Sequence, residues 1–277
     1  MVYWEYPDGK AAPMIFYFTG TGNSLAAAQT IAHATDDLLV DIGAAYKYKN
    51  FDFMLEQNEQ LGFVFPTYAW TTPPIIDAFL KHAHFRTGNK ETFTPGYCFA
   101  VISCGAFVGN TARIFANRLL EAQGINLDAS FSVKSVGNCT YLYAPAQGEK
   151  RQHMLVSAEH AARAVANRIV IREHVHAEHR NPAGVVLSKF TEQDEKPRST
   201  AEFFTLPTCI SCGQCADLCP TNTITLIEGT PRWAELGCTQ CFACLHRCPV
   251  NAIQYGSKTE RRGRYVNPVL AKAPRRA

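Results

Sequence analysis

The sequence CISCGQCADLCP at residues 209–220 returns as CTQCFACLHRCP at residues 238–249, and this pair decides the fold of the C-terminal region. Each copy has the pattern C-x-x-C-x-x-C-x-x-x-C-P. The repeat of 29 residues extends further, because CPTNTI at 219–224 is answered by CPVNAI at 248–253. Together the copies use eight of the eleven cysteines: Cys209, Cys212, Cys215, Cys219, Cys238, Cys241, Cys244 and Cys248. So dense and regular an array predicts a metal centre rather than a packed core.

This repeat resembles the 2[4Fe-4S] domain of bacterial ferredoxins over roughly residues 203–256. Three cysteines at three-residue intervals can surround one cubane, while the fourth, set further along and followed by proline, points elsewhere. The resemblance implies that the fourth cysteine of each copy serves the other cluster. Cluster I would take Cys209, Cys212, Cys215 and Cys248. Cluster II would take Cys238, Cys241, Cys244 and Cys219.

Two other interpretations of the cysteines remain open from spacing alone. Structural zinc uses four ligands in two pairs, which a third cysteine in the same run fits poorly. Disulfides need an oxidising compartment and favourable geometry, which eight crowded cysteines do not offer. Between the copies, residues 224–227 and 230–233 flank Glu228-Gly229 and predict a β-hairpin.

The N-terminal region contains a second signal. Residues 14–18, MIFYF, read as a buried strand that runs directly into Thr19, Gly20, Thr21, Gly22, Asn23 and Ser24, and a helix is predicted from Leu25 to about His33. A strand, a glycine-rich turn and a helix N-terminus together form an anion site, because free backbone N–H groups converge there. No lysine follows the turn, and only two glycines are present, so neither a Walker A loop nor G-x-G-x-x-G is matched.

This turn resembles the flavodoxin fingerprint, in which the loop holds the phosphate of FMN. Further apolar runs at 38–42, 61–65, 97–102 and 129–136 alternate with predicted helices at 73–85, 111–122 and 149–172. We expect a doubly wound α/β fold with a parallel five-stranded sheet in the order 2-1-3-4-5. In such sheets the ligand lies beyond the carboxyl ends of the strands.

By resemblance, two further loops at this edge would flank the isoalloxazine ring of FMN. One contains Pro66, Thr67, Tyr68, Ala69 and Trp70, and the other contains Ser103, Cys104 and Gly105. Tyr68 or Trp70 is the expected stacking partner, although either could instead pack in the core. A small buried residue is favoured for Cys104 over a flavin contact. Cys98 and Cys139 are interpreted as structural. Neither loop contains an acid, so we expect the fully reduced flavin to be less disfavoured than in acidic flavodoxins.

The boundaries follow from these signals. We expect a flavodoxin-like FMN domain at residues 1–180, a linker at 181–202 and a 2[4Fe-4S] domain at 203–277, whose extension beyond Tyr255 can pack back on the first domain. His176 and His179 have the spacing of a metal pair on a helix, but a solvated helix end is favoured. With no leader or membrane-span pattern, we expect a cytoplasmic protein.

The charge is uneven along the chain. Residues 200–277 contain nine Lys and Arg against five acids, a net of +4, whereas residues 1–199 contain 18 against 19, a net of −1. The basic tail from Arg261 to Arg276 has three explanations: a solvated tail, which is favoured, a docking surface for a redox partner, and nucleic-acid contact, for which no motif is present.

An FMN domain and a two-cluster domain on one chain resemble the flavodoxin/ferredoxin fusion proteins of anaerobes. The resemblance implies electron transfer among the clusters, FMN and protein partners such as a ferredoxin, a flavodoxin, a reductase or a dehydrogenase. Two alternatives are a flavin-dependent reductase of a small molecule and a redox sensor. No catalytic acid or base stands out near the loops, which favours the electron carrier.

Overall fold

A computed structural model describes residues 12–89, 91–175 and 199–272. The N-terminal half is built on a five-stranded sheet in the order β2-β1-β4-β6-β7, with every neighbouring pair parallel. Its strands are β1 (Met14–Tyr17), β2 (Leu38–Asp41), β4 (Gln60–Pro66), β6 (Tyr97–Cys104) and β7 (Ala129–Lys134). When these five strands are numbered by their order along the chain, this is the flavodoxin order 2-1-3-4-5, as predicted.

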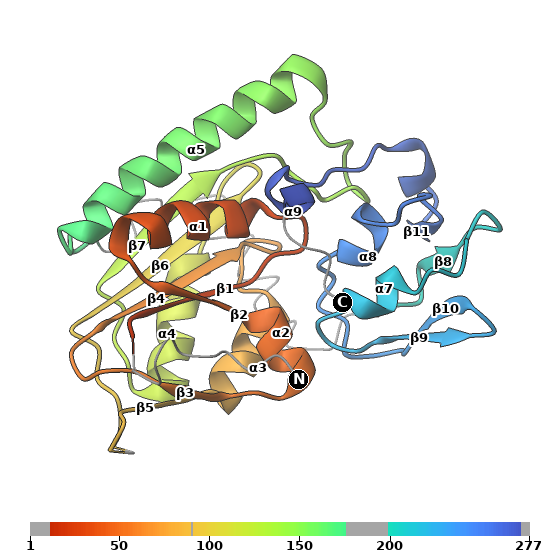
Figure 1. Cartoon of the computed structure of the whole chain (residues 1–277). Coiled ribbons are helices and arrows are strands. Elements are labelled where there is room, and N and C mark those ends of the chain that lie inside the picture. Colours follow the sequence, from red (N-terminus) through yellow and green to blue (C-terminus); the bar gives the residue numbers. More distant parts are fainter. Residues whose placement is uncertain (1–11, 90, 176–198, 273–277) are drawn as a thin grey trace.

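Helices cover both faces of this sheet (Figure 1). One face carries α1 (Asn23–Thr35) and α5 (Gly148–Val170), and the other carries α2 (Ile42–Tyr48), α3 (Pro74–His82) and α4 (Thr111–Gln123). Because both faces are covered, the inner strands β1, β4 and β6 are mostly apolar, whereas the edge strand β7 alternates Ser130 and Ser132 with Phe131 and Val133. In β6 all eight residues are buried, with Phe99 packed toward α1 and α5 and Cys98 packed toward the other face. Cys98 is therefore a core residue, in agreement with its predicted structural role.

A small second sheet pairs β3 (Asp52–Met54) with β5 (His84–Arg86). The sequence predicted one helix from residue 73 to about 85, but α3 ends at His82. The backbone turns extended at Ala83, and His84 donates its N–H to the carbonyl of Phe51. Strand pairing therefore replaces the last predicted turn of the helix, because Phe85 joins the aromatic cluster around Phe16.

The C-terminal half is the shorter of the two and is described over residues 199–272. It consists of two short antiparallel ladders and three one-turn helices. β8 (Phe203–Thr205) pairs with β11 (Ile253–Tyr255), and β9 (Ile224–Ile227) pairs with β10 (Thr230–Trp233) in the predicted hairpin. The helices are α7 (Gln214–Asp217), α8 (Ala243–His246) and α9 (Val269–Lys272), with a 3₁₀ turn, η2, at Thr259–Arg261. Phe203, Phe242, Leu245 and Ile253 form its small core.

Figure 1 shows the C-terminal half against one end of the large sheet, with α9 beside the start of α1. In the part of the chain that the structure describes, no helix is both long and apolar enough to cross a bilayer. His176, His179, most of the expected linker and the last five residues lie outside the described residues.

Candidate functional site

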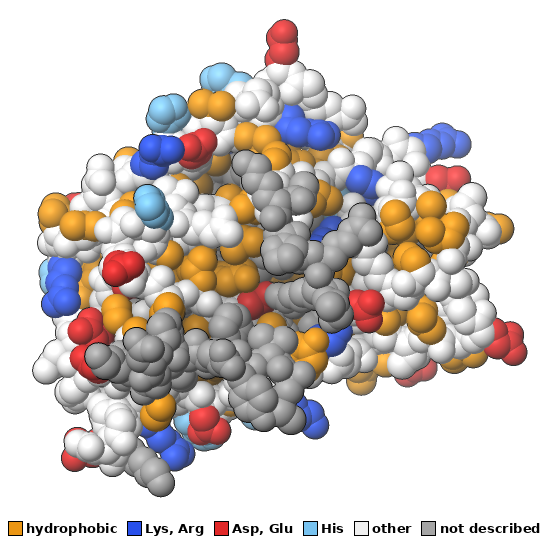
Figure 2. Space-filling model, in the orientation of Figure 1, with side chains coloured by type: hydrophobic (Ala, Val, Ile, Leu, Met, Phe, Trp, Pro, Cys, Tyr) orange, Lys and Arg blue, Asp and Glu red, His pale blue; other side chains and the backbone are white. Residues whose placement is uncertain are grey.

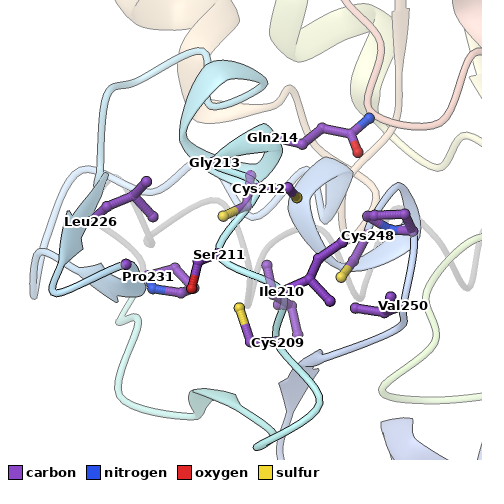
Figure 3. A pocket seen from close by; sticks show the side chains of 14 residues that line it. Cys209, Ile210, Ser211, Cys212, Gly213, Gln214, Leu226, Pro231, Cys248 and Val250 are labelled. Carbon is purple, nitrogen blue, oxygen red and sulfur yellow. The ribbon is translucent and has the colours of Figure 1, made fainter.

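The first cavity of the C-terminal half gathers cysteines from both sequence repeats. It is lined by Cys209, Cys212, Cys215 and Cys248. Figure 3 shows the sulfur atoms of Cys209, Cys212 and Cys248 arranged around a common space. We call this space cavity I. Three of its cysteines come from the first repeat and one from the second, which is the crossed set that the ferredoxin resemblance implied.

A second space, cavity II, has the reciprocal composition. It is lined by Cys219, Cys238, Cys241 and Cys244. All eleven cysteines are free thiols, so no pair within either set forms a disulfide. Among the described residues, no three His, Cys, Asp or Glu side chains gather as ligands of a single metal ion do. Two sets of four thiols around separate cavities fit the ligand requirement of two cubanes.

The backbone repeats as closely as the sequence does. Ser211 and Gln240, which precede the second cysteine of each sequence repeat, have φ of 54° and 53°. One residue beyond that cysteine, Gly213 and Phe242 have φ of 74° and 55°. These left-handed residues curl each run so that three side chains face one point, and they are costly for a bulky residue such as Phe242. Such conformational costs are typical of a backbone that is held in place around a binding site.

The fourth cysteine of each sequence repeat receives the same backbone hydrogen bond. Thr223 donates its N–H to Cys219 Sγ at 3.3 Å, and Ala252 donates to Cys248 Sγ at 3.2 Å. N–H donors favour the charged thiolate, the form that binds metal. Burial acts in the opposite direction and raises the pKa of Cys215 to about 11 and of Cys241 to about 12. Metal binding must therefore displace protons from these thiols.

The predicted phosphate loop, residues 19–24, follows β1 directly. Gly22 has φ 100° and precedes α1, and Thr19 Oγ1 accepts its N–H at 2.9 Å. No side chain caps the N-terminus of α1, which leaves its first N–H groups available to an anion. Thr21 and Ser24 are 2% and 1% exposed. Asn23 Nδ2 donates to the carbonyl of Val136 and Ser24 Oγ pairs with Ser103 Oγ, so the donors that this buried loop offers to a phosphate are the backbone N–H groups at the start of α1.

The two predicted ring loops lie side by side at the same sheet edge. Pro66 pairs with Ser103 in the strand register, and Ser103 Oγ lies 2.9 Å from Ser24 Oγ, which joins the second loop to the phosphate loop. Cys104 is buried, in line with the interpretation favoured from sequence, and burial raises its pKa to about 11. Gly105 approaches Gly137 closely, so that a Cβ there would lie 2.9 Å from the Gly137 Cα.

Tyr68 and Trp70 belong to one tight turn but point to different surroundings. Tyr68 and Thr71 exchange backbone hydrogen bonds, which places Ala69 and Trp70 at the turn with φ of 50° and 64°. Tyr68 packs edge-on against Phe18 in the core. Trp70 instead stacks on Phe107 of the other ring loop, with 5.6 Å between centroids and 15° between planes. Of the two aromatics, Trp70 bridges the loops expected to flank the ring.

Cavity II lies against the phosphate loop. A Cβ added to Gly20 would lie 2.3 Å from the carbonyl oxygen of Cys241, so only glycine permits this approach. Cys241 and Ala243 also belong to the same core cluster as Phe18 and Phe65 of the N-terminal half. The two halves therefore share a continuous core where cavity II meets the sheet edge.

The neutral side chain of His246, in α8, forms hydrogen bonds that link the two halves of the molecule. Its Nδ1 accepts the N–H of Tyr265, so its Nε2 carries the proton and donates to the carbonyl of Asn138 at 2.8 Å. Burial lowers its pKa to about 4. Lys47 adds a second link by donating to the carbonyls of Ala216 and Asp217.

The segment after η2, residues 262–272, packs back on the N-terminal half as expected. Asn267 donates its N–H to the carbonyl of Thr21 at 2.8 Å, and Tyr265 donates its hydroxyl to Asn23 Oδ1. The roles of Tyr265 and Asn267 were missed because no motif marks them. Arg262 and Arg264 likewise donate to backbone carbonyls inside the protein, so this part of the positive charge is structural.

Residues 202–249 match the family model of the 4Fe-4S dicluster domain. This range contains all eight cysteines of the two cavities, so the C-terminal half is a 4Fe-4S domain. Together with the flavodoxin-like sheet, the chain has the organisation of a flavodoxin/ferredoxin fusion protein. No curated protein matches the sequence.

Solved structures similar to this chain cover parts of it. They include a flavoprotein from Bacteroides uniformis ATCC 8492 (14% identity, 45% of this chain, 92% of that chain, TM-score 0.32). An archaeal flavodoxin matches at 12% identity (57% and 98%, TM-score 0.30). The NAD(P)H:quinone oxidoreductase from Methanothermobacter marburgensis matches at 11% (61% and 100%, TM-score 0.31). The strand order, rather than these similarities, defines the fold of the N-terminal half.

Proposed function

We propose that this protein is an electron-transfer iron-sulfur flavoprotein that links protein redox carriers to a bound FMN through two [4Fe-4S] clusters. Each cluster exchanges one electron, whereas a flavin exchanges one or two, so the combination connects two kinds of carrier. The observation that carries the proposal is the contact between Gly20 of the phosphate loop and the carbonyl of Cys241 at cavity II. This contact supports the proposal because it puts Cys241, a proposed cluster ligand, beside the loop proposed for the FMN phosphate.

The roles of the residues follow from the two cavities and the three loops. Cys209, Cys212, Cys215 and Cys248 would hold cluster I, and Cys238, Cys241, Cys244 and Cys219 would hold cluster II. Residues 19–24 would hold the FMN phosphate, with the ring at residues 66–70 and 103–105. Asn110 supports this assignment, because its buried Nδ2 at the same edge has no partner among the described residues and could donate to a ligand.

We infer that the partner docks over cavity I rather than cavity II. Cys212 is exposed at cavity I, and Ile210 and Val250 on its lining are 59% and 36% exposed, whereas Cys241 and Cys244 are buried. Figure 2 shows hydrophobic side chains gathered on the C-terminal half. An apolar patch around a redox centre fits a transient protein contact.

Stopped-flow measurements test this function. The reduced protein is mixed anaerobically with oxidised ferredoxin or flavodoxin, or with quinones and other small acceptors. We expect faster oxidation by the protein carriers, and Ile210→Glu should slow that step without changing the iron content, because it places a charge in the apolar patch. Rapid oxidation only by a small molecule, insensitive to Ile210→Glu, would indicate a reductase instead.

A further inference from the structure

Cavity II contains two buried hydrogen-bond donors whose partners are missing from the described part of the chain. The indole Nε1 of Trp233 and the hydroxyl of Thr239 are both inaccessible to solvent and both belong to residues that line the cavity. A buried donor without an acceptor costs about 1–3 kcal/mol. Two of them at one cavity indicate acceptors that the protein itself does not supply.

The surrounding contacts fix the indole of Trp233. Its ring stacks on Phe203 with 5.2 Å between centroids and 8° between planes, and the backbone of Trp233 is paired with Ile224 in the β9–β10 ladder. Indole nitrogen can only donate. Thr239 is 2% exposed and directly follows Cys238, so its hydroxyl is held beside the cysteine set. Both donors are therefore positioned before any cofactor binds.

Cavity I lacks an equivalent pair. In the sequence repeat, Ile210 stands where Thr239 stands in the second copy, and Ile210 is 59% exposed. Leu226, Pro231 and Ile253 also line cavity I, together with the polar residues Ser211 and Gln214. No residue that lines cavity I is among those with a buried, unpartnered side-chain donor in the described ranges. The two halves of the repeat therefore differ in hydrogen bonding although they share a backbone.

The structure assigns Trp233 and Thr239 as hydrogen-bond donors to sulfur atoms of the cluster held in cavity II, an inference that rests on the proposed function. Hydrogen bonds to cluster sulfur raise the reduction potential, because they stabilise the additional negative charge of the reduced form. Removing either donor lowers the potential of cluster II alone. The two residues thus tune the cluster that adjoins Gly20 and the phosphate loop.

The test is a redox titration followed by electron paramagnetic resonance, with iron counted in every sample. Trp233→Phe keeps a ring and removes the donor, and Thr239→Val keeps the shape and removes the hydroxyl. We expect each to lower the potential of one cluster and the double variant to lower it further. Thr239→Ser retains the hydroxyl and should titrate like the wild type.

Full iron content with unchanged potentials in Trp233→Phe and Thr239→Val would overturn the inference and leave the proposed function intact. A wild-type protein with only one cluster would overturn the proposed function itself. If a variant fails to assemble, NMR of the wild type still decides. We expect the Trp233 indole N–H signal to be shifted by the paramagnetic cluster relative to that of Trp70. An unshifted Trp233 signal would overturn the inference.

Discussion

At the scale of single residues, Gly20 joins the two halves of the molecule. It lies in the phosphate loop, and its missing Cβ leaves room for the carbonyl of Cys241. The glycine was predicted from sequence as part of an anion-binding turn. The structure gives it a second role, because the same residue admits the backbone at cavity II.

Gly20→Ala tests this contact. The new methyl group would lie 2.3 Å from a backbone oxygen that cannot rotate away, so we expect the free energy of unfolding to fall by about 1–3 kcal/mol. Gly88→Ala is the matched control, because a Cβ there meets nothing within 4 Å. Anaerobic urea titration measures both. Equal stability of the two variants would show that the halves do not pack as described.

Asp37 makes the free energy of unfolding depend on pH. Burial raises its pKa to about 6 from 3.8, although Thr35 and Gln60 donate hydrogen bonds to it. The folded state therefore holds a proton that the unfolded state has already lost between these pH values. Stability should fall as the pH rises from about 4 to about 6, by at most about 3 kcal/mol for a shift of this size.

Asp37→Asn removes this titration. We expect the difference in unfolding free energy between Asp37→Asn and the wild type to grow in favour of the variant as the pH rises from 4.5 to 7. Denaturant titrations at several pH values measure the difference. A difference that stays constant with pH would place the pKa of Asp37 near its ordinary value.

At the scale of elements, the segment at residues 262–272 closes over the phosphate loop. Tyr265 is 1% exposed, and its hydroxyl reaches Asn23, while Asn267 binds the backbone of Thr21. The N-terminus of α1 is therefore enclosed by a part of the chain more than 240 residues away. This enclosure predicts a flavin that leaves slowly.

Tyr265→Phe removes the hydroxyl that reaches Asn23. We expect a loss of about 1 kcal/mol in stability, the usual net value of such a hydrogen bond, and faster release of FMN. Tyr48→Phe is the control, since Tyr48 is half exposed. Flavin fluorescence after dilution measures the release. If both variants release FMN at the wild-type rate, the segment does not retain the cofactor.

The ring loops predict a property of the flavin that is proposed to bind there. Residues 66–70 and 103–107 contain no acidic side chain, so no carboxylate among them opposes negative charge on the reduced ring. We expect the potential for complete reduction of FMN to be less negative than in flavodoxins with acidic loops. Anaerobic potentiometry measures it. A very low potential for the final electron would contradict this expectation.

Most elements could be predicted from the sequence, and the exceptions have physical causes. The apolar run that became β6 and the glycine turn before α1 are local signals, because both depend on neighbouring residues. β3 and β5 were missed because three-residue strands carry little periodicity. The bonds of Tyr265 and His246 were missed because they join distant segments. The sequence shows that Thr239 stands where the first repeat has Ile210, but only the burial of its hydroxyl in the structure shows that this group needs a partner.

At the scale of the whole molecule, the repeated cysteines and the glycine turn are parts of one arrangement. Cavity I faces outward with exposed apolar neighbours, whereas cavity II is buried against the carboxyl edge of the parallel sheet. In doubly wound folds this edge is where ligands bind. The arrangement therefore leads from a surface that a partner can reach to the loops proposed for FMN.

The metal and flavin content of the anaerobically purified protein tests this account most directly. Iron, acid-labile sulfide, zinc and FMN are measured per chain in the same sample. Two cubanes and one phosphate loop predict about eight irons, about eight sulfides and about one FMN. Zinc in place of iron, or a protein with full iron and no flavin, would contradict the account.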